Sequence, residues 1–141
     1  MANAATRAPS RDHLDWPFLD DGHRALAAGL DAFVASGGLD GIDHHDADAA
    51  CKALVPKLGA AGFLRHCVPM AFGGAAQEID SRALCIVRET LAYADGLADF
   101  AFAMQGLGTG AISLAGSDEV KASILPKIAS GELISGFALT E

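Results

Sequence analysis

The chain has 141 residues, of which 51% are hydrophobic and 20% are charged. This balance is typical of one globular domain with a hydrophobic core, and it excludes an intrinsically disordered chain. Ten basic residues against 18 acidic ones give a net charge of −8 without any basic run, which argues against nucleic-acid binding. We interpret the acidic charge as an aid to solubility.

Three cysteines lie far apart in the sequence, at Cys51, Cys67 and Cys85. An odd number at wide spacing does not form a disulfide framework, so we expect free thiols in a reducing compartment. No run of about eighteen apolar residues is present, and we therefore expect no transmembrane helix. Residues 1–11 lack the apolar core of a secretion signal and only faintly resemble a mitochondrial presequence. We expect a cytoplasmic protein rather than one of the mitochondrial matrix.

Residues 1–14 are predicted to be a flexible tail, after which Asp20 or Asp21 can cap the first helix. Apolar residues then recur along one face of that helix, at Leu26, Leu30, Phe33 and Val34. Gly37 and Gly38 are typical of a helix end. The loop that follows contains His44 and His45, but adjacent histidines point to different sides, so we do not expect them to bind one metal ion.

A second helix is predicted to start near Asp46 and to end at Gly59 to Gly62. Its buried positions are expected to be Cys51, Leu54, Val55 and Leu58. Pro56 lies inside this pattern and should kink or break the helix, because proline lacks an N–H and clashes with the preceding turn. An irregular segment rich in glycine and proline then covers residues 62–74.

A third helix is predicted from Asp80 or Ser81 to about Ala94, and a fourth from Gly96 to the stop at Gly116. The fourth segment is apolar nearly all round, which is typical of a central helix, so we expect it to be the most buried of the set. Its three internal glycines cost helix stability and allow close approach of another group, at Gly106, Gly108 and Gly110.

A fifth helix starts after Ser117, a good cap, and ends at Gly131, with Pro126 again suggesting a kink or an early end. The sequence thus predicts an all-α fold, a bundle of about five helices within residues 15–132. Residues 133–141 are expected to form a short strand that leads into a further domain.

The residues alone do not indicate a self-contained catalyst. The sequence contains no Gly-x-Ser-x-Gly elbow, no His-Glu-x-x-His zinc motif and no phosphate-binding P-loop. Gly106, Gly108 and Gly110 lie in a helical pattern without a preceding strand, so they do not indicate a dinucleotide site. His66 and Cys67 are neighbours, but a Cys–His dyad is assembled from separate segments, and a structural thiol is the simpler interpretation.

Three segments, in this order, resemble the acyl-CoA dehydrogenase family. The first is Leu58-Gly59-Ala60-Ala61-Gly62-Phe63, followed by Val68-Pro69 and Gly73-Gly74. The second runs from Leu114-Ala115-Gly116-Ser117 through Leu125-Pro126-Lys127 to Gly131-Glu132. The third, Phe137-Ala138-Leu139-Thr140-Glu141, is similar to the opening of the family's flavin-binding signature. The region before Gly59 fits the family's first two helices but carries no motif.

The resemblance implies the N-terminal helical domain of a larger enzyme. The family continues with a middle β-barrel domain and a C-terminal helical domain, and the latter carries the catalytic glutamate, so no catalytic residue is expected in this chain. The chain ends inside the signature, and we expect either a truncated product or a remainder on a separate polypeptide. The implied partners are those two domains, an acyl-CoA substrate, an electron-accepting flavoprotein and further copies of the protein as a homo-oligomer.

The resemblance also implies a chemistry. The family oxidises an acyl-CoA thioester between its α and β carbons, a carboxylate removing the α proton while a hydride passes to FAD. Thr140 matches the threonine that bonds the pyrimidine edge of the flavin, and Phe137 and Leu139 match positions lining the same ring. The alternative for Thr140 is an ordinary strand residue.

Four residues match positions that form the wall of the acyl pocket in the family, at Phe100, Ala103, Met104 and Leu107. Their spacing is equally typical of a plain core face, and we keep both interpretations open. Two other functions compete with the enzyme domain: a helical module that binds a partner without catalysis, and an inactive truncated product. A helical domain taken from a larger enzyme would expose apolar surface, so we also expect the chain to self-associate.

Overall fold

The computed structural model describes residues 9–138. Five α-helices and three short 3₁₀-helices follow one another in this range, and none of its residues forms a β-strand. The α-helices are α1 Asp21–Ala35, α2 Ala47–Ala60, α3 Ser81–Ala94, α4 Gly96–Ala115 and α5 Asp118–Ser130. The 3₁₀-helices are η1 Asp12–Asp15, η2 Phe63–Cys67 and η3 Met70–Phe72. The all-α prediction is confirmed, and none of these helices is long and apolar enough to cross a membrane.

Each α-helix begins at a side chain that accepts a hydrogen bond from a free N–H of the first turn, as capping requires. These N-caps are Asp20, Asp46, Asp80, Asp95 and Ser117. Gly131 ends α5 with φ 79°, in the left-handed region that glycine tolerates. The predicted helix boundaries are therefore confirmed to within a few residues.

The two internal prolines end neither helix, so of the two expected alternatives, a kink or a break, the break is excluded. α2 continues past Pro56 to Ala60, and α5 continues past Pro126 to Ser130. The residue directly before each proline is buried, Val55 in α2 and Leu125 in α5. We attribute the continuation to this packing, which holds the last turn in helical form despite the missing N–H.

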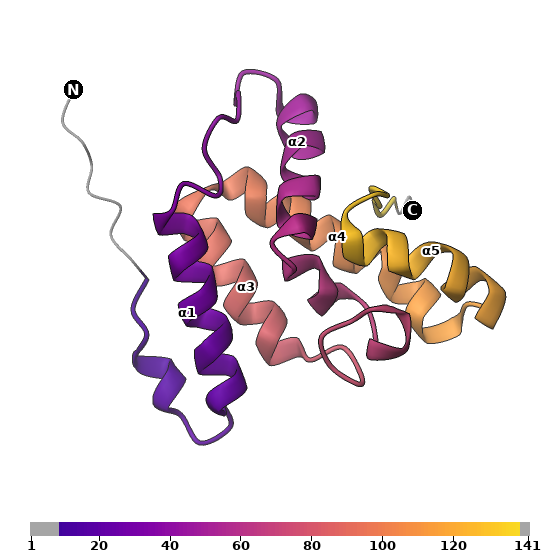
Figure 1. The fold of residues 1–141 in the computed structure, drawn as a ribbon, viewed down its shortest axis with the longest axis horizontal. Coiled ribbons are helices and arrows are strands. Elements are labelled where there is room, and N and C mark those ends of the chain that lie inside the picture. Colours follow the sequence, from indigo (N-terminus) through magenta and orange to yellow (C-terminus); the bar gives the residue numbers. More distant parts are fainter. Residues whose placement is uncertain (1–8, 139–141) are drawn as a thin grey trace.

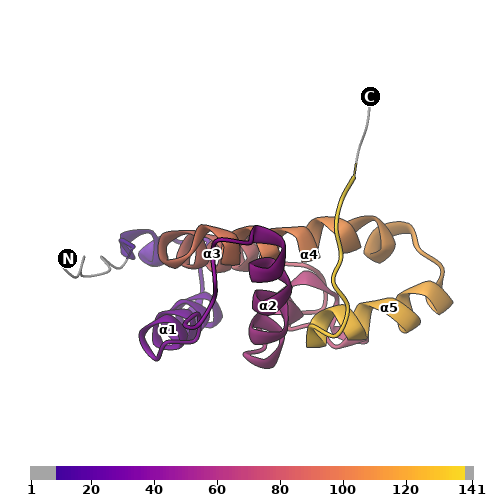
Figure 2. The same ribbon diagram turned by 90° about the horizontal axis from the view of Figure 1, so that it is seen from above.

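The helices form two layers (Figure 2). α3 and α4 follow each other along one layer, and α1, α2 and α5 lie in the other (Figures 1 and 2). α1 packs on α3, while α2 and α5 pack on α4, and η2 fills the space between α2, α4 and α5. One continuous core joins all of these elements and includes Leu30, Leu54, Leu64, Leu91, Phe102 and Ile128.

α2 and α5 meet at their C-terminal ends without side chains between them. A Cβ atom on Gly59 would collide with the carbonyl oxygen of Ser130, and one on Gly131 would lie 2.8 Å from that of Val55. Only glycine permits this backbone-to-backbone approach. The end of α5 is therefore fixed directly against α2.

α4 is not the most buried helix, contrary to the prediction. Its buried residues share one face and are Ala98, Ala101, Phe102, Gln105 and Thr109. The opposite face leaves Phe100, Leu107 and Leu114 exposed at 52%, 53% and 87%. The inner face combines the small side chains Ala98 and Ala101 with Phe102, and three further large apolar residues lie on the outer face.

Both ends of the described chain differ from expectation. The predicted flexible tail extends to residue 14, whereas the Arg11 guanidinium contacts Asp31 at 2.6 Å and Thr90 at 2.7 Å, and Leu14 is buried. The predicted strand is absent from residues 133–138, which form no ladder with another strand. A strand needs a backbone neighbour, and here the segment lies on a helix instead.

Candidate functional site

A pocket of about 320 Å³ lies between α3 and α4, and we call it the α3–α4 pocket. Its apolar wall consists of Ile79, Leu84, Phe102, Ala103 and Leu107. Pockets of this size and apolar character suit part of a small ligand with a hydrocarbon portion. The polar lining is sparse and comes from Ser81, Arg88 and two thiols.

The predicted acyl-pocket residues are divided by the structure. Ala103 and Leu107 line the α3–α4 pocket, whereas Phe100 and Met104 are not among its lining residues. Phe100 and Leu107 are more than half exposed, so the plain-core interpretation of the stripe is wrong for these two positions. The α3 side of the pocket, which includes Leu84 and Arg88, was not predicted from the sequence, because only the fold brings this helix beside α4.

The inner end of the pocket is formed by Cys67 and Gly106. The Cys67 sulfur lies only 3.8 Å from where a Cβ atom on Gly106 would be, so the glycine keeps this end open. Burial raises the pKa of the Cys67 thiol to about 12. The thiol therefore stays protonated at neutral pH and acts as an apolar surface rather than a nucleophile.

Arg88 lines the α3–α4 pocket with its charge already paired. Its Nε and Nη2 atoms donate to the two carboxylate oxygens of Asp99 at 2.8 and 2.9 Å. This hydrogen bonding raises the pKa of Arg88. A paired guanidinium of this kind leaves the pocket without a free charge from α3, which suits an apolar occupant.

Residues 133–138, which we call the C-terminal segment, lie across α4. The buried Gln105 side chain donates to the Leu133 carbonyl at 2.9 Å and accepts from the Ser135 N–H at 2.6 Å. Figure 2 shows the chain passing α4 here and then leaving the two layers. Phe137 in this segment is 55% exposed. Leu139 and Thr140, the other predicted flavin contacts, lie outside the described residues.

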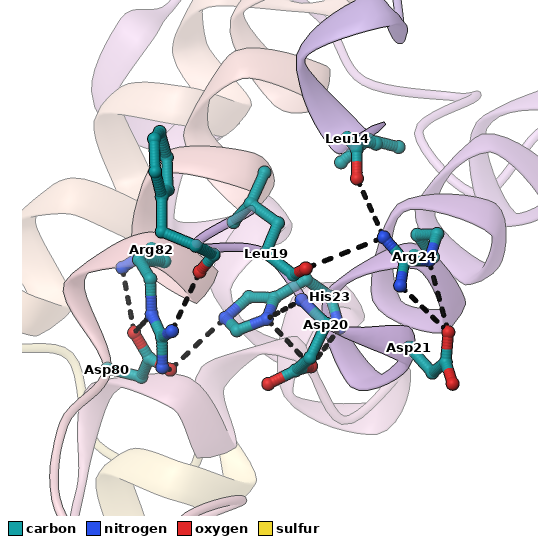
Figure 3. A network of polar contacts seen from close by, with 9 residues as sticks. Leu14, Leu19, Asp20, Asp21, His23, Arg24, Asp80 and Arg82 are labelled. Carbon is teal, nitrogen blue, oxygen red and sulfur yellow. Dashed lines mark hydrogen bonds and ion pairs between the residues drawn. The ribbon is translucent and has the colours of Figure 1, made fainter. Parts of the chain in front are cut away.

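The start of α3 is tied to the start of α1 by a polar network around His23 (Figure 3). The buried His23 ring lies between two carboxylates, with Nδ1 2.8 Å from Asp20 and Nε2 3.1 Å from Asp80. Arg82 donates to Asp80 through Nε and Nη2 at 3.0 and 2.7 Å, and this bonding holds the pKa of Asp80 well below its usual range. The network is structural, and it fixes the helix that carries one wall of the pocket.

His44 and His45 do not come together at a metal site. His44 is 2.8 Å from Asp95, and that carboxylate raises the pKa of His44. Among residues 9–138 no group of three or more histidine, cysteine or acidic side chains is arranged to hold a metal ion. His44 instead links the loop before α2 to the cap of α4.

Comparison with known proteins agrees with this architecture. Residues 20–132 match the family model described as "Acyl-CoA dehydrogenase, N-terminal domain". The "Probable acyl-CoA dehydrogenase fadE25" of Mycobacterium leprae is 38% identical over 105 residues, which are 71% of this chain and 26% of that protein. A "Probable acyl-CoA dehydrogenase" of Bacillus subtilis is 31% identical over 124 residues, which are 86% of this chain and 20% of that protein.

A solved structure shows the same fold. The acyl-CoA dehydrogenase complexed with FAD from Bacillus anthracis superposes with a TM-score of 0.68 at 26% identity, covering 84% of this chain and 20% of that chain. Fold and pocket thus define a helical N-terminal domain with an apolar pocket between α3 and α4. The chain belongs to the acyl-CoA dehydrogenase family. It spans between a fifth and about a quarter of the length of the curated relatives it matches.

Proposed function

We propose that this chain is the N-terminal domain of a flavin-dependent acyl-CoA dehydrogenase, which introduces a double bond between the α and β carbons of an acyl-CoA thioester. The observation that carries the proposal is that α4 contributes both to the apolar pocket and to the anchoring of the C-terminal segment. One face of this helix lines an apolar pocket through Ala103 and Leu107, and its buried face holds, through Gln105, the segment that leads to Phe137. The same helix thereby carries both a wall of the hydrocarbon site and the anchor of the proposed flavin edge.

In this proposal the α3–α4 pocket receives part of the acyl chain. Its wall offers hydrocarbon surface, and the paired Arg88 adds no unbalanced charge. Phe100 and Met104 belong to the same stripe and would contact substrate only beyond the pocket itself. The burial of hydrocarbon in such a site favours binding by roughly 25 cal/mol for each Å² removed from water.

The FAD would be contacted at its edge by Phe137, Leu139 and Thr140. An exposed aromatic ring at Phe137 fits the face of a planar cofactor. When bound, the flavin supplies the hydride acceptor. The Thr140 hydroxyl and N–H would donate hydrogen bonds to its pyrimidine edge, where such donors stabilise negative charge.

The remaining parts of the reaction would come from the family's middle β and C-terminal helical domains. We further propose that they cover the outer face of α4, which exposes Phe100, Leu107 and Leu114. The assembled protein, which we call the holoprotein, would be a cytoplasmic homo-oligomer that passes electrons to an acceptor flavoprotein. We expect no activity from the 141 residues alone.

The test is anaerobic titration of the holoprotein with a series of acyl-CoA thioesters, following the flavin absorbance. The yellow colour should bleach as the flavin is reduced, and Thr140→Ala should weaken flavin binding or slow bleaching roughly tenfold to a hundredfold. A holoprotein without flavin, or one that no acyl-CoA bleaches, would contradict the proposal.

The α3–α4 pocket has its own test in the same assay. Ala103→Phe fills the pocket and should lower kcat/KM for long acyl chains more than for short ones. Ala28→Phe is the matched control, because Ala28 is exposed on α1, away from α4, and is not among the residues that line the pocket. Equal effects of the two substitutions on all chain lengths would exclude the pocket as the acyl site.

A further inference from the structure

Gln105 is the one fully buried amide on α4. Its side chain is 0% exposed, in a helix whose other buried positions are mostly small or apolar. A buried amide is costly unless its donor and acceptor are both used. Here the Nε2 group donates to the Leu133 carbonyl, and Oε1 accepts from the Ser135 N–H.

The two bonds have the pattern of a β-ladder. In a parallel sheet one residue donates to a carbonyl and accepts from an N–H two positions further along the neighbouring strand. The Gln105 amide does the same toward Leu133 and Ser135. A side chain of α4 thus takes the place of a strand, and the C-terminal segment gains a defined register against the helix.

Two further contacts keep the segment close to α4. The Ser135 hydroxyl lies 3.1 Å from the Met104 carbonyl, the Gln105 carbonyl and Gln105 Oε1, and donates its one proton to one of them. Gly108 makes room for this approach, because a Cβ atom there would lie 2.7 Å from the Ser135 Cβ and 2.9 Å from the Gly136 nitrogen. The segment is therefore fixed between Leu133 and Gly136, directly before Phe137.

We propose that Gln105 is a positioning residue for the flavin: it sets the register of the C-terminal segment and so determines where Phe137 and the residues after it meet the cofactor. This inference rests on the proposed function. Gln105 does not touch the reacting atoms; it acts through Leu133 and Ser135. A one-residue slip of an extended segment would turn Phe137 to the opposite side, which is why the register matters.

The test compares three variants of the holoprotein with the wild type. Gln105→Leu keeps the approximate size and removes both hydrogen bonds. Gln105→Glu keeps the acceptor, and it regains a donor only when its carboxyl group is protonated. Val87→Ala is the control for general destabilisation, because Val87 is buried on α3, is not among the residues that line the pocket and makes no hydrogen bond to the segment through its side chain. The readouts are the flavin dissociation constant, the flavin midpoint potential and amide hydrogen exchange at Ser135.

We expect Gln105→Leu to weaken flavin binding roughly tenfold, to shift the midpoint potential and to speed exchange at Ser135. At high pH Gln105→Glu keeps the Ser135 bond but sets a carboxylate against the Leu133 carbonyl, so it should weaken flavin binding and shift the potential without speeding exchange at Ser135. At low pH it should approach the wild type, each compared with the wild type at the same pH. Val87→Ala should leave affinity and potential unchanged. If Gln105→Leu does not fold, Gly108→Ala displaces the same segment sterically and should give the same three changes.

The outcomes separate the two proposals. Wild-type affinity and potential in Gln105→Leu and in Gly108→Ala, with a flavin-loaded wild type, would overturn the positioning role alone. The same shifts in Val87→Ala would also overturn it, because they would then follow from lost stability. A wild-type holoprotein that holds no flavin would instead contradict the proposed function, and the positioning role with it.

Discussion

Arg88 on α3 donates two parallel hydrogen bonds to Asp99 on α4, from Nε to Oδ1 at 2.8 Å and from Nη2 to Oδ2 at 2.9 Å. The pair spans the two helices that enclose the α3–α4 pocket, and the Arg88 side chain is about half exposed. Exposed pairs contribute little, so we expect a coupling of about 1 kcal/mol at most. A double-mutant cycle with Arg88→Ala and Asp99→Ala, followed by urea unfolding, measures this coupling free energy. The coupling should decrease in high salt. If the two substitutions lower the free energy of unfolding by strictly additive amounts, the pair does not stabilise the domain.

Gly108 and Gly110 lie two residues apart on α4, and their substitution by alanine should affect stability differently. Nothing lies within 4 Å of a Cβ atom placed on Gly110, so Gly110→Ala should raise the free energy of unfolding by roughly 0.5–1 kcal/mol. Gly108→Ala would press on Ser135 and should lose that gain. Thermal unfolding of both variants measures the difference. An equal gain at both positions would mean that the C-terminal segment does not lie against Gly108.

Asp80 should make the domain sensitive to acid. Arg82, and with it His23, lowers the pKa of this carboxyl in the folded state. A depressed folded pKa adds stability that is present above about pH 4 and is lost as the pH falls toward the folded value. Asp80→Asn retains a good N-cap but removes the charge. It should lower the free energy of unfolding by about 1 kcal/mol at pH 7.

The measurement for Asp80 is urea unfolding at pH 7 and at pH 3. The difference in the free energy of unfolding between the wild type and Asp80→Asn should be smaller at pH 3 than at pH 7. Asp21→Asn is the control, because the Asp21 side chain is fully exposed. A difference that stays constant between the two pH values would contradict the role of the Asp80 charge.

The three thiols should react with an alkylating reagent in an order set by burial. The thiolate is the reactive form, and a Cys67 pKa of about 12 leaves almost none of it at pH 8. Cys85 is exposed and should be modified first, whereas Cys67 should react only on unfolding. Mass spectrometry after timed alkylation measures the order. Rapid native labelling of Cys67 would show that the inner end of the pocket opens to solvent.

The helix boundaries could be predicted because their signals are local. A capping side chain such as Asp46 or Ser117 stands directly before an apolar pattern, and Gly131 directly after one. These signals depend only on neighbouring residues, so tertiary packing did not change them. The same locality explains why a break at Pro56 was one of the expected alternatives, because the packing that keeps its helix continuous comes from distant elements.

The pocket and the orientation of α4 could be predicted only in part. A helix that is apolar nearly all round does not reveal which side its neighbours cover. Ala98 and Ala101 face the core and Phe100 faces outward, an arrangement set by how closely α2 and α3 approach. Ala103 was found through the family resemblance, whereas Leu84 comes from another helix at a place that only the fold brings near. Gln105 had one local signal, a polar residue in the middle of an apolar helix.

The C-terminal segment leaves the domain from a point that three helices define together. The segment follows directly after α5. The close backbone approach at Gly59 holds α2 against the end of α5, and Gln105 binds the segment to α4. Contacts with three helices determine both the position and the direction of the segment. A small displacement of α2, far from any proposed ligand, would therefore change the direction in which the segment leaves the domain. Substitutions at Gly59 should thus alter how a ligand is oriented, although Gly59 does not contact it.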